Sequence, residues 1–268
     1  MSFIDLLYGT APGRAAVQLA LRMGASRQIA DFLRSPASRC LIRPFVRKYG
    51  VDLRCYAAEQ YGSFADFFVR RKLHTEFDAE DSHFISPCDA WLSAYPITAA
   101  ASFAIKGSHY RLRDVLGDEA LAKEYRGGLC LILRLTVSDY HRYIFVDDGY
   151  SHESHFIEGE LHSVQPIACE RFPVYRLNRR CWTLLETEHF GPVVQAEIGA
   201  MAVGGIVNEK QNSRFSRGEE RGRFELCGST IVLLLKNDSI ALRPEISAAL
   251  ETQSEVKVHL GEWIGTKI

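Results

Sequence analysis

The sequence lacks several patterns that would assign it to a common class of protein. It has no run of about 18 apolar residues, the length that a membrane-spanning helix needs. It has no G-x-G-x-x-G fingerprint and no G-K-S phosphate loop, the glycine patterns of nucleotide sites. Its seven cysteines are an odd number without a Cys-x-x-Cys pair, and its nine histidines show no zinc-like spacing. We therefore expect reduced thiols and no metal site.

Charge and composition narrow the choice further. The 268 residues carry a formal net charge of -1, and 47% are hydrophobic, which is typical of an ordinary globular protein. The balanced charge gives no reason to expect a nucleic-acid partner. The start, Met-Ser-Phe-Ile-Asp, lacks a basic segment followed by an apolar one, so we expect no secretory signal.

Basic residues are concentrated at one end of the chain. Residues 1–50 hold eight Arg and Lys against two Asp, a formal charge of +6. Within them, residues 14–33 follow a helical period, with Val17, Leu21 and Ala25 on one face. Such a helix either lies on an anionic membrane surface or docks on the core with a solvated basic rim. Taken alone, the segment favours the second reading.

The pattern of apolar residues changes near residue 84, from mainly helical to mainly strand-like. Helices are predicted at 14–33 and at 63–71, where Ser63 is placed to act as N-cap, with a short one at 112–116. Strand-like apolar runs, separated by glycines and turn residues, lie at 103–105, 129–137, 193–198, 230–235 and 256–260. We therefore predict an α+β fold, with N-terminal helices followed by a mostly antiparallel, β-rich core. The expected division is a helical, basic segment at 1–75 and a core at 76–268.

Three short segments carry side chains suited to chemistry, and each also has an ordinary structural explanation. Ser229 follows Gly228 and could attack the preceding carbonyl if a base takes its proton, although Gly-Ser pairs are common at turns. Asp89 could orient an imidazole or complete a proline-containing turn. His141, which follows a buried strand, could transfer protons near neutral pH or pair with Asp139 or Asp147 at the surface.

Taken together and in order, nine segments resemble the motif blocks of the phosphatidylserine decarboxylase family across nearly the whole chain. They include an aromatic-arginine block at Ser63–Arg71, a Ser-Pro-x-Asp segment at Ile85–Ala90 and an Asp-Tyr-His-Arg signature at Asp139–Arg142. The block Cys227-Gly228-Ser229-Thr230 resembles the family's self-cleavage site. The others lie at 106–116, 159–166, 178–180, 198–204 and 217–224.

The resemblance implies a self-processing proenzyme. Ser229 would attack the carbonyl of Gly228, and elimination from the resulting ester would leave a pyruvoyl group at position 229. The products would be a 228-residue β chain and a 40-residue α chain. The substrate amine would form a Schiff base with the pyruvoyl ketone, which takes up the electrons released with carbon dioxide. Asp89 would orient or polarise a catalytic group, and His141 would assist proton transfer.

The resemblance also implies partners and a place in the cell. The substrate would be phosphatidylserine and the product phosphatidylethanolamine, with another amine-bearing carboxylate as the alternative substrate. The chain would be a peripheral protein at the cytoplasmic side of the cell membrane. Its partners would be the phospholipid, an anionic membrane surface and its own α and β chains, with a homodimer left open.

Three positions depart from the family pattern: Ala90 stands where glycine is usual, Cys227 where glycine or another small residue is common, and Ile144 in the last position of the Asp-Tyr-His-Arg-x-His signature. The family signature reads Asp-Tyr-His-Arg-x-His, and its second histidine is assigned to the Asp-His-Ser relay for self-cleavage, whereas this chain has Ile144 there. Three accounts are open. His141 acts as base, or His155 or His162 reaches the site from a neighbouring strand, or the chain stays uncleaved. In the last case it would be a divergent homologue that binds a lipid or amino-acid ligand without the cofactor.

Overall fold

The computed structural model describes residues 9, 10, 12, 13, 16, 25–57, 60–105, 108–160, 162, 163, 174–200, 205–226, 229–252 and 254–268. Several features named above lie outside the described residues: residues 14, 15 and 17–24 of the first predicted helix, residues 161, 164–166 and 201–204 of two motif blocks, Lys106 and Gly107, and Cys227 and Gly228. Ser229 and the strand that it begins are described.

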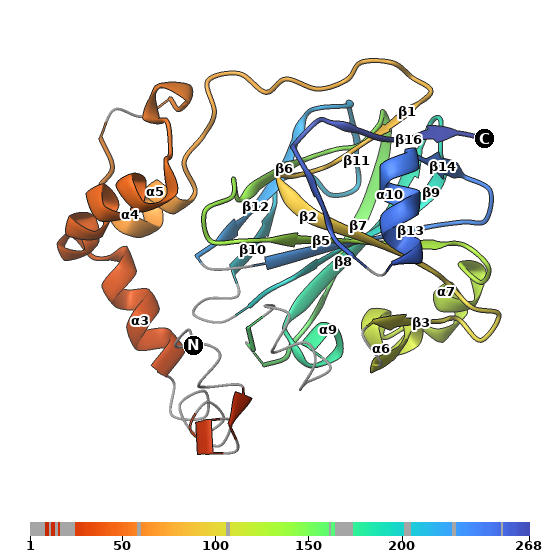
Figure 1. Ribbon diagram of the computed structural model, residues 1–268, viewed down its shortest axis with the longest axis horizontal. Coiled ribbons are helices and arrows are strands. Elements are labelled where there is room, and N and C mark those ends of the chain that lie inside the picture. Colours follow the sequence, from red (N-terminus) through yellow and green to blue (C-terminus); the bar gives the residue numbers. More distant parts are fainter. Residues whose placement is uncertain are drawn as a thin grey trace.

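The N-terminal part of the described chain is helical. It contains α3 (Ala25–Arg34), η1 (Pro36–Leu41), α4 (Ile42–Tyr49), η2 (Leu53–Cys55) and α5 (Phe64–Phe68). These helices gather on one side of the molecule, and a long connection leads from α5 to the first strand (Figure 1).

The predicted helix at 63–71 begins where expected but is shorter. The Ser63 hydroxyl accepts a hydrogen bond from the Asp66 N–H at 3.1 Å, which caps the first turn. The helix ends at Phe68, and Val69 leaves the helical conformation. Arg70, which the prediction placed inside the helix, is instead buried against the core.

An eight-stranded antiparallel sheet forms the centre of the molecule. Its strand order is β11-β7-β8-β9-β13-β5-β2-β15. The bounds are β2 (Ala90–Pro96), β5 (Leu129–Leu135), β7 (Gly149–Ile157), β8 (Arg180–Thr187), β9 (Gly191–Ile198), β11 (Ser213–Phe215), β13 (Ser229–Leu235) and β15 (Val256–Val258).

Smaller sheets and short helices complete the core. The sheets join β1 (His83–Ile85), β16 (Trp263–Lys267) and β14 (Ile240–Leu242); β10 (Gly205–Asn208), β12 (Glu220–Glu225) and β6 (Arg142–Ile144); and β3 (Ser102–Ile105) with β4 (Ser108–Arg111). The helices are α6 (Leu112–Leu116), α7 (Glu119–Glu124), α9 (Val174–Leu177) and α10 (Pro244–Glu251).

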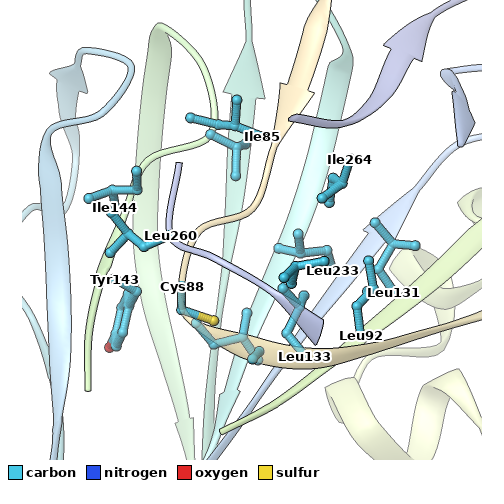
Figure 2. Close-up of a cluster of buried hydrophobic side chains, with 14 of the residues drawn as sticks. Ile85, Cys88, Leu92, Leu131, Leu133, Tyr143, Ile144, Leu233, Leu260 and Ile264 are labelled. Atoms are coloured by element: carbon cyan, nitrogen blue, oxygen red, sulfur yellow. The ribbon is translucent and has the colours of Figure 1, made fainter. Parts of the chain in front are cut away.

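Every residue of β13 is buried, because both faces of the large sheet are covered. Alternate side chains of a strand point to opposite faces. Leu233 therefore lies in one hydrophobic cluster, with Leu131 and Leu133 from β5 (Figure 2). Val232 lies in a second cluster, which α6, α7 and α9 cover on the other face.

The predicted α+β class, with N-terminal helices and a mostly antiparallel β-rich core, is confirmed. The expected division near residue 75 stays a prediction. Within the described ranges, every helix is too short or too polar to cross a bilayer.

Candidate active site

Ser229 is the first residue of the central strand β13, and it is only 2% exposed. It lies opposite Leu135, the last residue of β5, and the following Thr230 lies opposite Ile198, the last residue of β9. Antiparallel register therefore places Gly199 beside Ser229 on its other flank. The serine sits where three neighbouring strands begin or end.

His141 lies in the chain that continues from β5, and it is completely buried. Its Nδ1 is 2.9 Å from the carbonyl oxygen of Asp139. Its own carbonyl accepts a hydrogen bond from the N–H of Phe224 at 2.9 Å, and Phe224 belongs to β12, the strand that leads toward position 228. Backbone bonds therefore hold His141 between the neighbour strand of Ser229 and the strand that precedes the Gly228–Ser229 bond.

The chemical state of His141 follows from these contacts. Burial lowers the pKa of His141 to about 3, and the positive charge of Arg70 acts in the same direction. The ring is therefore neutral near pH 7. Because a carbonyl can only accept, Nδ1 carries the proton and Nε2 carries the lone pair. Among the described residues Nε2 has no hydrogen-bond partner, so it is a buried nitrogen able to accept a proton.

Asp89 contacts a backbone amide and two basic side chains. Its carboxylate accepts a hydrogen bond from the Leu260 N–H at 2.8 Å and lies 3.8 Å from both Lys72 Nζ and His259 Nδ1. None of its contacts within the described residues reaches the imidazole of His141. Asp89 directly precedes β2. In the large sheet β2 lies two strands from β13, an interstrand separation of about 10 Å.

Ile144 lies next to the segment that carries Asp89. Its N–H donates to the carbonyl of Pro87 at 3.0 Å. Its side chain is buried in the large hydrophobic cluster, where Figure 2 shows it near Leu260 and Tyr143. Ile144, a core side chain, therefore fills the position where the family signature has a histidine. The nearby Asp89 contacts Leu260, Lys72 and His259 instead.

His155 is too far from Ser229 to take its proton. It lies on β7, three strands from β13 in the large sheet, a separation of about 14 Å. It is exposed, and its ring stacks on Trp182 with 4.1 Å between centroids.

His162 is connected to the flank of Ser229 through one buried amide. The Asn178 Nδ2 donates to the carbonyls of both His162, at 2.8 Å, and Gly199, at 2.7 Å. The His162 N–H donates back to Asn178 Oδ1 at 3.0 Å. The buried ring of His162 also meets a carboxylate, with Nε2 2.5 Å from Glu160 Oε2. Asn178 therefore anchors His162 to the strand end beside Ser229.

Sequence reasoning missed a buried ion pair on the same face of the sheet as Ser229. Glu197 Oε1 and Arg221 Nε are 3.2 Å apart, and both side chains are 0% exposed. Glu197, on β9, lies opposite Ile231, two residues along β13 from Ser229. Arg221 lies on β12. The pair therefore connects β12, which precedes the Gly228–Ser229 bond, to β9, which pairs with β13. The only sequence signal was a lone acid in the apolar run 193–198.

Comparison with known proteins was made on the whole sequence. A family model described as phosphatidylserine decarboxylase matches residues 64–266. A protein named phosphatidylserine decarboxylase proenzyme 2, from Clostridium acetobutylicum, is 41% identical over 265 residues, which cover 98% of this chain and 91% of that protein. A phosphatidylserine decarboxylase proenzyme from Ruminiclostridium cellulolyticum is 36% identical, over 99% of this chain and 91% of its own length.

Proposed function

Because the chain belongs to the phosphatidylserine decarboxylase family, we propose that it removes the serine carboxyl group of phosphatidylserine and releases phosphatidylethanolamine. The observation that carries the proposal is the position of Ser229. It begins a fully buried central strand and is flanked by the ends of β5 and β9. Buried His141 continues from one of those strands, and His162 is anchored to the other.

The proposed cofactor is a pyruvoyl group made from Ser229. The site fits this change, because a cut before the first residue of β13 leaves its ladders to β5 and β9 intact. Ser229 Oγ attacks the carbonyl carbon of Gly228, the C–N bond breaks and an ester forms. Elimination then breaks the Cβ–Oγ bond and releases Gly228 as a carboxylate. Water replaces the nitrogen of the resulting dehydroalanine, and ammonia leaves.

His162 is the base that we assign to this cleavage. Asn178 connects it to Gly199 on the flank of Ser229, and Glu160 contacts its Nε2, as an acidic group orients the histidine of a serine triad. This assignment accounts for processing in a chain that has Ile144 in the family's histidine position. His155 lies too far away in the sheet.

In the second stage, the pyruvoyl group would supply an electron sink for the loss of carbon dioxide. His141 assists by accepting and returning a proton at Nε2, which is unprotonated near pH 7. Asp89 helps to position the edge of the site, because its carboxylate accepts a hydrogen bond from the Leu260 N–H and lies near Lys72 Nζ.

We further propose that the protein acts at the cytoplasmic side of the cell membrane, bound peripherally to an anionic surface. On α3, Ile29 and Phe32 share a helix face and are 49% and 47% exposed, while Ala30 is buried. Arg27 and Arg34 flank them on the same helix. Exposed apolar side chains within a basic helix suit the interface of an anionic bilayer. A lipid substrate gives the protein a reason to be there.

The test is a decarboxylation assay with carboxyl-labelled phosphatidylserine in mixed micelles. The purified protein should release labelled carbon dioxide and form phosphatidylethanolamine, whereas Ser229→Ala should release none. Release from another amine-bearing carboxylate, but not from phosphatidylserine, would support the alternative substrate. A chain that stays uncleaved and inactive on all of them would overturn the proposal and favour a ligand-binding homologue.

A further inference from the structure

Among the described residues, Arg70 is a buried cation without an acidic partner. It follows α5, is 3% exposed, and forms no ion pair with a carboxylate in the described part of the chain. Its guanidinium lies over the rings of Tyr56 and Phe67, with 4.9 and 5.1 Å to the ring centroids. Its Nε has no hydrogen-bond partner among the described residues. A buried charge without a counter-charge is costly, so a specific role is needed to explain it.

The hydrogen bonds of Arg70 reach the loop that carries His141. Its Nη2 donates to the carbonyls of Ser138 and Asp139, at 3.3 Å each. The Asp139 carbonyl is the same one that lies 2.9 Å from Nδ1 of His141. One oxygen therefore accepts from both the guanidinium and the imidazole.

Two neighbours of Arg70 contact the same loop. The ring of Phe68 packs on the imidazole of His141, with 4.0 Å between centroids. The carbonyl of Val69 accepts a hydrogen bond from Arg142 Nε at 2.8 Å. The three residues 68–70 thus hold the loop on both sides of His141.

We propose that Arg70 is a positioning residue for the reaction, which fixes the Asp139 carbonyl and thereby keeps His141 in its Nδ1–H form, with Nε2 open to the substrate. The role of His141 in the reaction rests on the proposed function. The state of the imidazole does not, and it can be measured without any turnover.

The charges around His141 support this role. Burial lowers the pKa of His141 most, and Arg70 lowers it further, whereas the hydrogen bond and charge of Asp139 raise it. The Asp139 carboxylate is itself paired with Lys257 Nζ at 2.7 Å. The nearby Arg142 is paired with Glu220. Of the charges that the described residues place next to the ring, Arg70 is therefore the uncompensated one, and its removal should let His141 bind a proton more easily.

The experiment is nitrogen-15 NMR of the histidine rings in the purified full protein, with the His141 signals identified from the spectrum of His141→Gln. In the unaltered protein, Nδ1 should be protonated and Nε2 unprotonated from pH 8 to pH 5. Arg70→Gln should raise the pH at which His141 titrates by about one unit. Arg70→Lys, which keeps the charge, should shift it less. The matched control is Arg71→Gln, because Arg71 is the exposed neighbour and the charge change is identical.

A second readout is the pH profile of kcat/KM, whose acid limb should move upward in Arg70→Gln and stay in place in Arg71→Gln. The proposal is overturned if His141 of the unaltered protein carries its proton on Nε2 at pH 7. It is also overturned if Arg70→Gln titrates like the Arg71 control. The first result needs no variant, so it decides even if Arg70→Gln fails to fold. NMR shifts as expected in a protein that does not decarboxylate would refute the proposed function and leave the positioning role standing.

Discussion

Two residues, Ile144 and His162, carry the proposed account of self-cleavage in this chain. Ile144 is a core residue beside the Asp89 segment, so the position that would pair a histidine with Asp89 contributes packing instead. His162 has a carboxylate contact of its own, from Glu160, and the buried amide of Asn178 connects it to Gly199, the residue opposite Ser229. We therefore assign self-cleavage to His162 and Glu160, on the β9 side of Ser229, which is opposite to the side of Asp89.

Replacing the three histidines one at a time separates their roles. His162→Ala should slow cleavage by about 100-fold or more, the contribution expected of a general base. His141→Ala should cleave but decarboxylate slowly, and His155→Ala should do both normally. The measurement is the fraction of full-length chain against time on a denaturing gel. Normal cleavage in His162→Ala would remove it as the base.

Ile144→His tests the packing role of position 144. A polar ring placed in the apolar cluster without a designed partner should destabilise the protein by about 1–3 kcal/mol. The control Ile144→Val removes one methylene group and should cost about 0.5–1.5 kcal/mol. Urea unfolding of Ser229→Ala versions of both variants measures this without interference from cleavage. An Ile144→His variant as stable as the parent would contradict the assigned packing role.

His141 should make stability depend on pH. Its folded pKa of about 3 lies below the ordinary value of 6.5. Between those values the unfolded state takes up a proton that the folded state refuses, so stability is lost as pH falls. The slope for one proton is about 1.4 kcal/mol per pH unit. The free energy of unfolding of Ser229→Ala, measured with urea from pH 7 to pH 4, should fall with this slope. The double variant Ser229→Ala/His141→Gln should show a smaller slope. Equal slopes would show that the imidazole is not held neutral.

At the scale of elements, a buried ion pair joins β12, which belongs to the small sheet β10-β12-β6, to β9 of the large sheet. Glu197 receives hydrogen bonds from Gln195 Nε2 at 2.9 Å and from Asn208 Nδ2 at 3.2 Å, in addition to Arg221. After cleavage, β12 would be the last strand of the β chain, so this network would hold a new chain end in place.

Glu197→Gln should therefore destabilise the protein by about 3–5 kcal/mol, because it leaves the guanidinium of Arg221 buried without its counter-charge. Glu209→Gln makes the same chemical change in the more exposed pair with Arg223 and should cost about 1 kcal/mol at most. Urea midpoints of the two variants give the comparison. Equal losses would mean that the buried pair has no special weight.

The same scale shows what the sequence could and could not predict. The strands β5, β9 and β13 were visible as apolar runs because they are buried on both faces. The strand β7 was not, because it mixes polar and exposed residues and contains an irregularity between Ser151 and Ser154. Neither Arg70 nor Glu197 could be identified as a site residue, since the burial of each arises from segments distant in sequence.

For the whole molecule, the N-terminal helices on one side of the sheet core are the proposed membrane contact (Figure 1). Phe32→Ser should weaken co-sedimentation with anionic vesicles, and added salt should weaken it further, because basic residues share that surface. Phe156→Ser is the matched control, since Phe156 is also exposed but lies on β7. Equal loss in both variants would place the membrane contact elsewhere.

The central claim is that Ser229 becomes the first residue of a separate chain. The most direct test is the intact mass of the purified protein under denaturing conditions. The account predicts two chains, residues 1–228 and residues 229–268, the smaller one lighter than a serine-initiated peptide by the mass of one ammonia. A single chain of 268 residues, in protein that is folded and incubated to completion, would contradict it.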